Sequence, residues 1–295
     1  MKELVVLSGK GGTGKTSIVA SFSVLAKDVV TADCDVDAPD LNIIFDATNE
    51  MEDNFYGMKK ARIMPGHCIA CGKCEEICRY GAIYFDGPGN GRYPKTYRVE
   101  PLNCEGCGLC AYFCAENAIE FKENLSGKLY FGKSRLGNLV HARLFAGEEN
   151  SGKLVAKVRE RAKAVAEREN IPLIITDAPP GVGCPVISSI TGADYALIVA
   201  EPTLSGLHDC ERVHQLLNSF GVPSGVVVNK ADIAPKISRK IEDWAKDNEV
   251  TFFGELPYDP DVTLAQIEKK AVVEYKDTEV AEEIKKLWEK LRQIL

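Results

Sequence analysis

Two kinds of residue pattern in this chain could carry chemistry, and the first is a set of cysteines. Eight of the eleven cysteines lie between Cys68 and Cys114, in two runs that each read C-x2-C-x2-C-x3-C. Three closely spaced thiolates suit three corners of a 4Fe–4S cluster, and in paired runs of this kind the fourth thiolate ligates the cluster of the other run. The expected ligands are Cys68, Cys71, Cys74 and Cys114 for one cluster, and Cys104, Cys107, Cys110 and Cys78 for the second.

The cysteine runs belong to an internal repeat. The stretch "RIMPGHCIACGKCEEICRYGAIYF" begins at Arg62, and "RVEPLNCEGCGLCAYFCAENAIEF" begins at Arg98. Zinc is the alternative metal, but zinc sites favour pairs of C-x2-C, whereas both halves here carry a complete set of four cysteines. Gly72 and Gly108 also fit a cluster, because a residue without a side chain lets the backbone pass close to inorganic sulfur.

The second pattern is a glycine-rich loop. The sequence "GKGGTGKT", from Gly9 to Thr16, fits G-x4-G-K-[ST], whose backbone N–H groups bind phosphate at the start of a helix. Lys15 is expected to reach the β and γ phosphates, and the Thr16 hydroxyl is expected to ligate Mg²⁺. The nucleotide-binding residues expected here are Gly11, Gly12, Thr13, Gly14, Lys15, Thr16 and Ser17.

Carboxylates follow two later strands of the chain. "DCDVDAPDL" begins at Asp33 and "DAPPG" begins at Asp177. We expect Asp35 and Asp177 to reach Mg²⁺, directly or through water, and Gly181 to donate its N–H to the γ-phosphate. For Asp37 and Asp40 an ordinary surface role fits equally well. The next such motif is "VNKAD", from Val228, in which the Asn229 amide is expected to meet the adenine edge.

The elements that position these residues alternate between strand and helix. "VVTAD", "LIITD", "YALIVA" and "GVVVN" are short β-branched runs typical of buried parallel strands. Helical stretches such as 207–220 and 237–246 separate them, which predicts an α/β fold with a doubly wound, mostly parallel sheet. The predicted domains are a discontinuous nucleotide-binding domain, 1–58 and 124–295, and a small inserted α+β domain, 59–123.

These motifs together resemble known families. The cysteine-rich part, about Ala61 to Lys122, resembles the bacterial-type two-cluster ferredoxin, although Arg79 and Ala115 replace the proline usual after the fourth cysteine. "KGGTGKT", "DCDVDAPDL", "DAPPG" and "VNKAD", in that order, look like the MinD/ParA/Mrp group of P-loop ATPases. "GEENSGKLV" from Gly147 and "GELPYDP" from Gly254 also match that group. The whole chain is thus similar to MinD-superfamily ATPases with an inserted ferredoxin domain.

The resemblance implies a slow, partner-stimulated ATPase that binds ATP with Mg²⁺. It implies that Lys10 crosses a dimer interface to the partner subunit's nucleotide, so that ATP holds two subunits together. The alternative is that Lys10 only lines its own loop. Asp35 would orient the attacking water, with Asp40 as the second candidate, and Pro257 of "GELPYDP" is a further nucleotide contact.

Three functions fit these features. The first is ATP-gated electron transfer through two 4Fe–4S clusters, and the second is ATP-dependent assembly or delivery of a cluster. The third is a MinD-like positioning or regulatory switch with redox-sensing clusters. A carrier needs a labile cluster with a shared ligand, for which Cys184 is the one candidate. Cys34 and Cys210 are expected to pack as small apolar residues.

Composition limits the partners. A net charge of −7 on 295 residues gives no general basic field, so nucleic acid is not expected. The apolar runs fall short of the ~18 residues that span a membrane, and the start of the chain lacks a signal peptide, which makes the cytoplasm the expected location. In the last helix Val280, Ile284, Leu287, Leu291 and Ile294 share one face, which we expect to dock on the sheet rather than on a membrane. The expected partners are a second copy of the chain and an unidentified redox or cluster-acceptor protein.

Overall fold

The computed structural model describes all 295 residues and divides the chain into two compact units. The sheet unit contains 1–53, 128–143 and 151–295, and the cysteine unit contains 54–127 and 144–150. The expected insert, 59–123, falls inside the cysteine unit. The segment 144–150, which the sequence placed in the nucleotide-binding domain, belongs to the cysteine unit as well.

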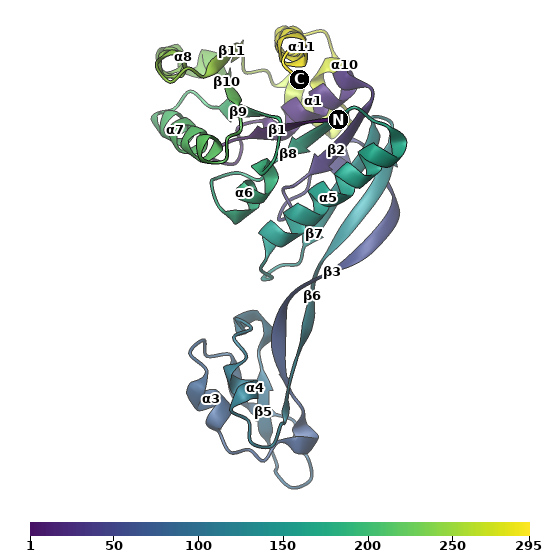
Figure 1. Cartoon of the computed structure of the whole chain (residues 1–295), viewed down its shortest axis with the longest axis vertical. Coiled ribbons are helices and arrows are strands. Elements are labelled where there is room, and N and C mark those ends of the chain that lie inside the picture. The colour runs from purple at the N-terminus through teal and green to yellow at the C-terminus, as the bar shows by residue number, and fades with distance from the viewer. The chain divides into compact units, whose positions relative to one another are not determined.

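The sheet unit is built on a large, mostly parallel sheet whose nine strands have the order β11-β10-β9-β1-β8-β2-β7-β6-β3 (Figure 1). Parallel pairing joins β1 to β8 and β9, β2 to β7 and β8, and β10 to β9 and β11. The α/β class and the parallel sheet were therefore predicted correctly. The strands are β1 (Lys2–Leu7), β2 (Val29–Asp33), β3 (Thr48–Ile63), β6 (Ile119–Ser134), β7 (Gly137–Leu144), β8 (Leu173–Asp177), β9 (Tyr195–Ala200), β10 (Ser224–Asn229) and β11 (Thr251–Leu256).

Alternating side chains give the sheet an apolar layer on each face. In β1, Leu4 and Val6 enter one core cluster, while Val5 and Leu7 enter the other. Each such burial contributes about 1.5–3 kcal/mol. Figure 1 shows α1, α10 and α11 on one side of the sheet, with α5, α6 and α7 on the other. The helices are α1 (Lys15–Ala26), α2 (Leu41–Ile44), α5 (Ser151–Glu169), α6 (Cys184–Ile190), α7 (Leu204–Ser219), α8 (Pro235–Asp247), α9 (Asp261–Ile267), α10 (Val272–Tyr275) and α11 (Glu279–Arg292).

The last helix packs against the sheet unit, as predicted. Its expected apolar face is buried from Val280 to Leu291, whereas Ile294 beyond the helix is 47% exposed. Trp288 adds a contact that the pattern did not indicate, since its ring lies 5.1 Å from that of Phe22 in α1. Among the helices of this structure, none combines the length and apolar character needed to cross a membrane.

The cysteine unit repeats one structural motif, as its sequence does. In each half a 3-10 turn that begins at a proline precedes the cysteine loop, and a short helix follows the loop. Gly72 and Gly108 precede those helices with φ of 81° and 75°, a conformation that favours glycine. The elements are η1 (Pro65–His67), α3 (Lys73–Ile77), β4 (Ile83–Gly87), β5 (Thr96–Val99), η2 (Pro101–Asn103) and α4 (Leu109–Tyr112), and β4 pairs antiparallel with β5.

The segment 144–150 is held in the cysteine unit by a partly buried carboxylate. Glu148 forms a 2.9 Å ion pair with Lys60 and accepts hydrogen bonds from Asn124 and Ser126 at 2.8 and 2.9 Å. The Phe145 N–H donates to the Ser126 carbonyl at 2.8 Å. The motif that begins at Gly147 therefore belongs to the cysteine unit up to Asn150 and to the sheet unit from Ser151, where α5 begins.

Candidate nucleotide site and cysteine cavities

The glycine-rich loop borders a polar cavity of about 390 Å³ in the sheet unit. Its size is in the range of ordinary ligand pockets. Thr13, Lys10, Gly181 and Asp177 are predicted site residues that do not line it. The predicted residues that line it are Gly11, Gly12, Gly14, Lys15, Thr16, Ser17, Asp35, Asp40, Asn229 and Pro257.

The loop takes its shape from glycine conformations and from one asparagine. Gly12 and Gly14 have φ of 81° and 92°, and a side chain on Gly14 would lie 2.3 Å from Asn229 Nδ2. Asn229 Nδ2 donates to the Thr13 carbonyl at 2.8 Å, so this amide helps to fix the backbone of the loop. Its expected contact with adenine remains a prediction.

A hydroxyl and a carboxylate meet where Mg²⁺ is expected. Thr16 Oγ1 donates to Asp177 Oδ2 at 2.7 Å, because the parallel pairing of β1 with β8 brings the two loops together. The other oxygen, Asp177 Oδ1, is buried without a hydrogen-bond partner. Burial raises the pKa of Asp177 to about 6, with Lys15 acting in the opposite direction. A cation at this point would satisfy the unpartnered oxygen, so the donor set fits Mg²⁺.

The loop after β2 is tied to a buried aspartate. Asp33 accepts the backbone N–H groups of Asp35 and Leu41, each at 3.1 Å, and these bonds fix the course of the loop from 35 to 41. Burial raises the pKa of Asp35, while the charge of Lys15 lowers it. Asp35 therefore lines the cavity close to the charge of the loop lysine.

Lys10 points away from the cavity of its own subunit. Its Nζ lies 3.1 Å from Thr203 Oγ1 and 3.2 Å from Ser205 Oγ, at the start of α7. Glu201 is 3.5 Å away and also pairs with Lys230, whose Nζ donates to the Gly12 carbonyl at 2.9 Å. The sequence motifs did not indicate this group of residues around Lys10.

Other cavity residues were also missed. Gln266 in α9 lines the cavity, and its Nε2 donates to Ser17 Oγ at 2.8 Å. The available signal was the "GELPYDP" motif, which ends just before α9. The lining residues that sequence reasoning missed are Ala38, Lys230, Tyr258, Asp259, Val262, Thr263 and Gln266.

Gly181 has a positive φ of 98°, as expected of a tight turn after β8. Its N–H donates to the Ser8 carbonyl at 3.0 Å. A bond to the γ-phosphate would require this contact to change, so that role stays a prediction.

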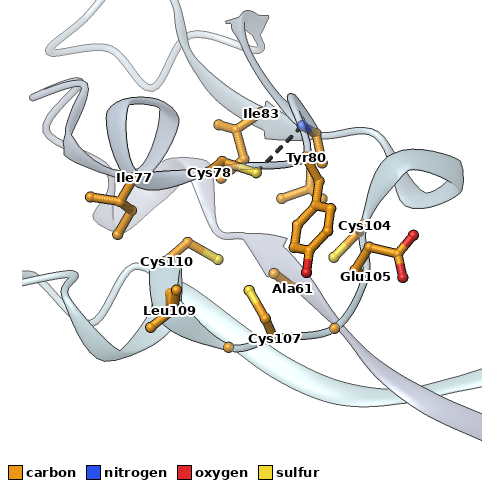
Figure 2. Close-up of a pocket in the computed structure, with 14 residues that line it drawn as sticks. Ala61, Ile77, Cys78, Tyr80, Ile83, Cys104, Glu105, Cys107, Leu109 and Cys110 are labelled. Atoms are coloured by element: carbon orange, nitrogen blue, oxygen red, sulfur yellow. Dashed lines mark hydrogen bonds between the residues drawn. The ribbon is translucent and has the colours of Figure 1, made fainter.

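The eight repeat cysteines line two cavities, four to each. One cavity is bordered by Cys78, Cys104, Cys107 and Cys110, whose sulfurs Figure 2 draws around one space. The other is bordered by Cys68, Cys71, Cys74 and Cys114. No group of three or more His, Cys, Asp or Glu side chains in the structure is arranged to hold a metal ion. The sulfurs of the two fourth cysteines accept matching bonds, Cys78 from the Ala82 N–H at 3.4 Å and Cys114 from the Ala118 N–H at 3.3 Å.

The three other cysteines differ in exposure. Cys34 and Cys210 are buried, as predicted, at 0% and 2% exposure. Cys184 is exposed at the first position of α6.

Comparison with known proteins gives the family. Residues 4–272 match the family described as the CobQ/CobB/MinD/ParA nucleotide binding domain. An uncharacterized protein of Methanocaldococcus jannaschii is 35% identical, with 99% of this chain and 97% of that protein aligned. A second uncharacterized protein of the same organism is 27% identical, with coverages of 94% and 93%.

Solved structures share the fold. The cell division ATPase MinD of Pyrococcus furiosus superposes with a TM-score of 0.59 at 19% identity, over 100% of this chain and 99% of that one. MinD of Pyrococcus horikoshii, solved with Mg-ADP, gives 0.58 at 18% identity over 99% and 96%. McdA of Cyanothece without nucleotide gives 0.59 at 15% identity over 99% of both chains. The chain therefore belongs to the CobQ/CobB/MinD/ParA family of nucleotide-binding domains, and it is an ATPase of the MinD/ParA type.

Proposed function

We propose that this ATPase is an ATP-dependent dimer whose nucleotide state controls electron transfer through two 4Fe–4S clusters. The clusters would be held by an inserted ferredoxin-like domain at 59–123. The observation that carries the proposal is the distribution of the eight repeat cysteines over two cavities. Each cavity receives three cysteines from one half of the repeat and the fourth from the other half.

The cysteine cavities suit clusters in three respects. In a 4Fe–4S cluster each cysteine sulfur binds a different iron, so the four sulfurs need not converge on one point as they do around a single ion. Four cysteines around one cavity are therefore the arrangement that a cluster requires. Gly72 and Gly108 supply backbone without side chains beside those spaces. The N–H groups of Ala82 and Ala118 donate to the sulfurs of Cys78 and Cys114, which fixes the positions of these two proposed ligands. When bound, such clusters supply one-electron transfer at low potential.

In ATP hydrolysis some residues of the nucleotide site would neutralise the charge of the phosphates, and others would orient the attacking water. Lys15 neutralises the terminal phosphates, and Thr16 and Asp177 hold Mg²⁺. Asp35 orients the attacking water, with Asp40 as the alternative. In the same proposal Lys10 leaves its partners at the start of α7 and reaches the nucleotide of the second subunit.

The first experiment tests the clusters. Anaerobically purified protein should contain about eight irons per chain, from two cubanes. Cys71→Ser and Cys114→Ser should remove the same cluster, although Cys71 and Cys114 lie in different halves of the repeat. Cys78→Ser, in the same half as Cys71, should remove the other cluster. Cys184→Ser is the matched control and should keep all the iron. Stoichiometric zinc without charge-transfer absorption would contradict the assignment.

The second experiment separates electron transfer from cluster delivery. Loaded protein, reduced and with or without ATP, is mixed with a one-electron acceptor protein and separately with an apo-ferredoxin. ATP-dependent oxidation with the iron retained supports electron transfer. Movement of iron to the apo-ferredoxin supports a carrier instead.

A further inference from the structure

A second cavity, of about 570 Å³, lies in the sheet unit beside the loop that follows β2. Its walls come from that loop, from α2 and from β3, β6 and β7. Because β2 and β7 are parallel, their carboxyl ends open at the same edge of the sheet, where ligands commonly bind in open α/β sheets. The polar and aromatic side chains that line this cavity include Asp37, Asp40, Asn42, Tyr130, His141 and Arg143.

His141 is the most unusual residue of the cavity. It is 3% exposed, and its ring stacks on Tyr130 with centroids 4.8 Å apart and planes at 18°. Nε2 lies 3.0 Å from Asn49 Oδ1, and an amide oxygen can only accept, so the ring proton is on Nε2. Nδ1 is then a hydrogen-bond acceptor, and it is buried without a partner. Burial lowers the pKa of His141 to about 4, so the ring is neutral at pH 7.

The neighbouring groups are also acceptors. Asn42 Oδ1 is a second buried acceptor without a hydrogen-bond partner. Asp37 and Asp40 add two carboxylates, while the nearby Glu52 is paired with Lys128. Arg143 is the one cationic side chain that lines the cavity, so acceptors and negative charge predominate.

We propose that this cavity binds an organic cation with N–H donors, that is, an alkylammonium or guanidinium group. Such a group supplies the hydrogen bonds that His141 Nδ1 and Asn42 Oδ1 lack, and its charge complements Asp37 and Asp40. The space suits an organic group rather than a bare ion. The site is independent of the proposed clusters, because all its residues belong to the sheet unit.

The loop after β2 connects this site with the nucleotide. Ala38 and Asp40 line both cavities, so the loop forms a wall that they share. A cation that orders this wall changes nucleotide affinity, and linkage requires nucleotide to change the affinity for the cation by the same factor.

The test is calorimetric titration of the full chain with methylguanidinium and with spermidine, with and without ADP. Tetramethylammonium has the same charge as methylguanidinium but no N–H donor, and it should bind at least tenfold more weakly. His141→Phe keeps the aromatic stack and should weaken binding about tenfold, the effect of one charge-assisted hydrogen bond. Asn42→Asp should strengthen binding, and Gln293→Glu, which makes the same charge change on an exposed site, should not.

A direct readout keeps the test independent of protein stability. In wild-type protein the ¹⁵N resonance of His141 Nδ1 should shift upfield as methylguanidinium saturates the site. Equal binding of tetramethylammonium, or an unmoved Nδ1 resonance at saturation, would overturn the proposal. A tripeptide Gly-Arg-Gly with blocked ends separates the sources: tighter binding than spermidine assigns the site to an arginine of a polypeptide, and weaker binding assigns it to a free polyamine.

Discussion

Lys10 and Glu201 belong to the same subunit, and the Lys10 ammonium lies 3.5 Å from the Glu201 carboxylate. Thr203 and Ser205 complete a set of three oxygen partners for this lysine. A lysine with partners in its own subunit must give them up before it can contact a second subunit. In the proposed dimer, Lys10 therefore has to leave Glu201 before it reaches the nucleotide of the second subunit.

Lys10→Ala should abolish the ATP-dependent dimer while ATP binding to the monomer persists, because Lys15 and the loop amides remain. The measurement is light scattering with ATP in an Asp35→Ala background, which blocks hydrolysis. Glu201→Gln weakens the hold on Lys10 and should promote the dimer at lower protein concentration. If Lys10→Ala self-associates with ATP as the parent does, the role of Lys10 across the interface is wrong.

Because Asp177 is buried, the effect of Asp177→Asn on the melting temperature should have opposite signs with and without Mg-ADP above pH 6. Its pKa is about 6 when folded against 3.8 for the ordinary carboxyl, so the folded state binds the proton more tightly. Stability is therefore lost as pH rises from about 4 through 6. The melting temperature of Asp177→Asn minus that of wild type should increase across this range without Mg²⁺. With Mg-ADP, whose proposed binding uses the ionised carboxylate, the difference should reverse in sign above pH 6.

A buried ion pair joins β1 to α5. Arg159 donates to both oxygens of Glu3 at 2.7 Å and to the carbonyls of Ser188 and Thr191 at 2.8 Å. Arg159→Ala leaves the Glu3 charge buried and should cost about 3–5 kcal/mol of unfolding free energy. Arg168→Ala, which breaks an exposed pair, should cost less than about 1 kcal/mol. Urea unfolding followed by tryptophan fluorescence reports this unit, since Trp244 and Trp288 both lie in it.

ATP should shift the reduction potential of at least one cluster. Asn150 of the cysteine unit is followed directly by α5, whose Gly152 packs against Cys184 at the first position of α6, the helix that follows the Asp177 loop. A typical coupling of about 1–3 kcal/mol corresponds to a shift of about 40–130 mV for a one-electron couple. Potentiometric titration without nucleotide, with ADP and with a non-hydrolysable ATP analogue measures it. Identical reduction potentials in all three states would show that the nucleotide site and the clusters are uncoupled. Lys15→Ala, which should not bind nucleotide, is the control and should show no shift.

The sequence predicted what depends on local pattern. The parallel strands and the loop from Gly9 follow from β-branched runs and glycine spacing, whereas the assignment of the eight repeat cysteines to two clusters stays a prediction. Asn229 shows where this reasoning stopped, because its motif named the residue but not its bond to the Thr13 carbonyl.

Contacts between distant segments were out of reach. Glu148 belongs to the cysteine unit through Lys60, Asn124 and Ser126, although its motif resembles part of the ATPase. His141 lies in β7, and the hydrophobic periodicity of the sequence does not specify that β7 pairs with β2. Gln266 reaches Ser17 across 249 positions of sequence, and only the fold brings such residues together.

The strand order also sets a sequence of events during synthesis. The first strand made, β1, lies between β8 and β9, which begin at Leu173 and Tyr195. The cysteine unit ends at Asn150, before either neighbour of β1 has left the ribosome. Since domains fold as units in the order of synthesis, the cysteines can be enclosed while the glycine-rich loop still lacks the sheet that shapes it. In the proposed function, iron would then enter a nascent chain that does not yet bind nucleotide.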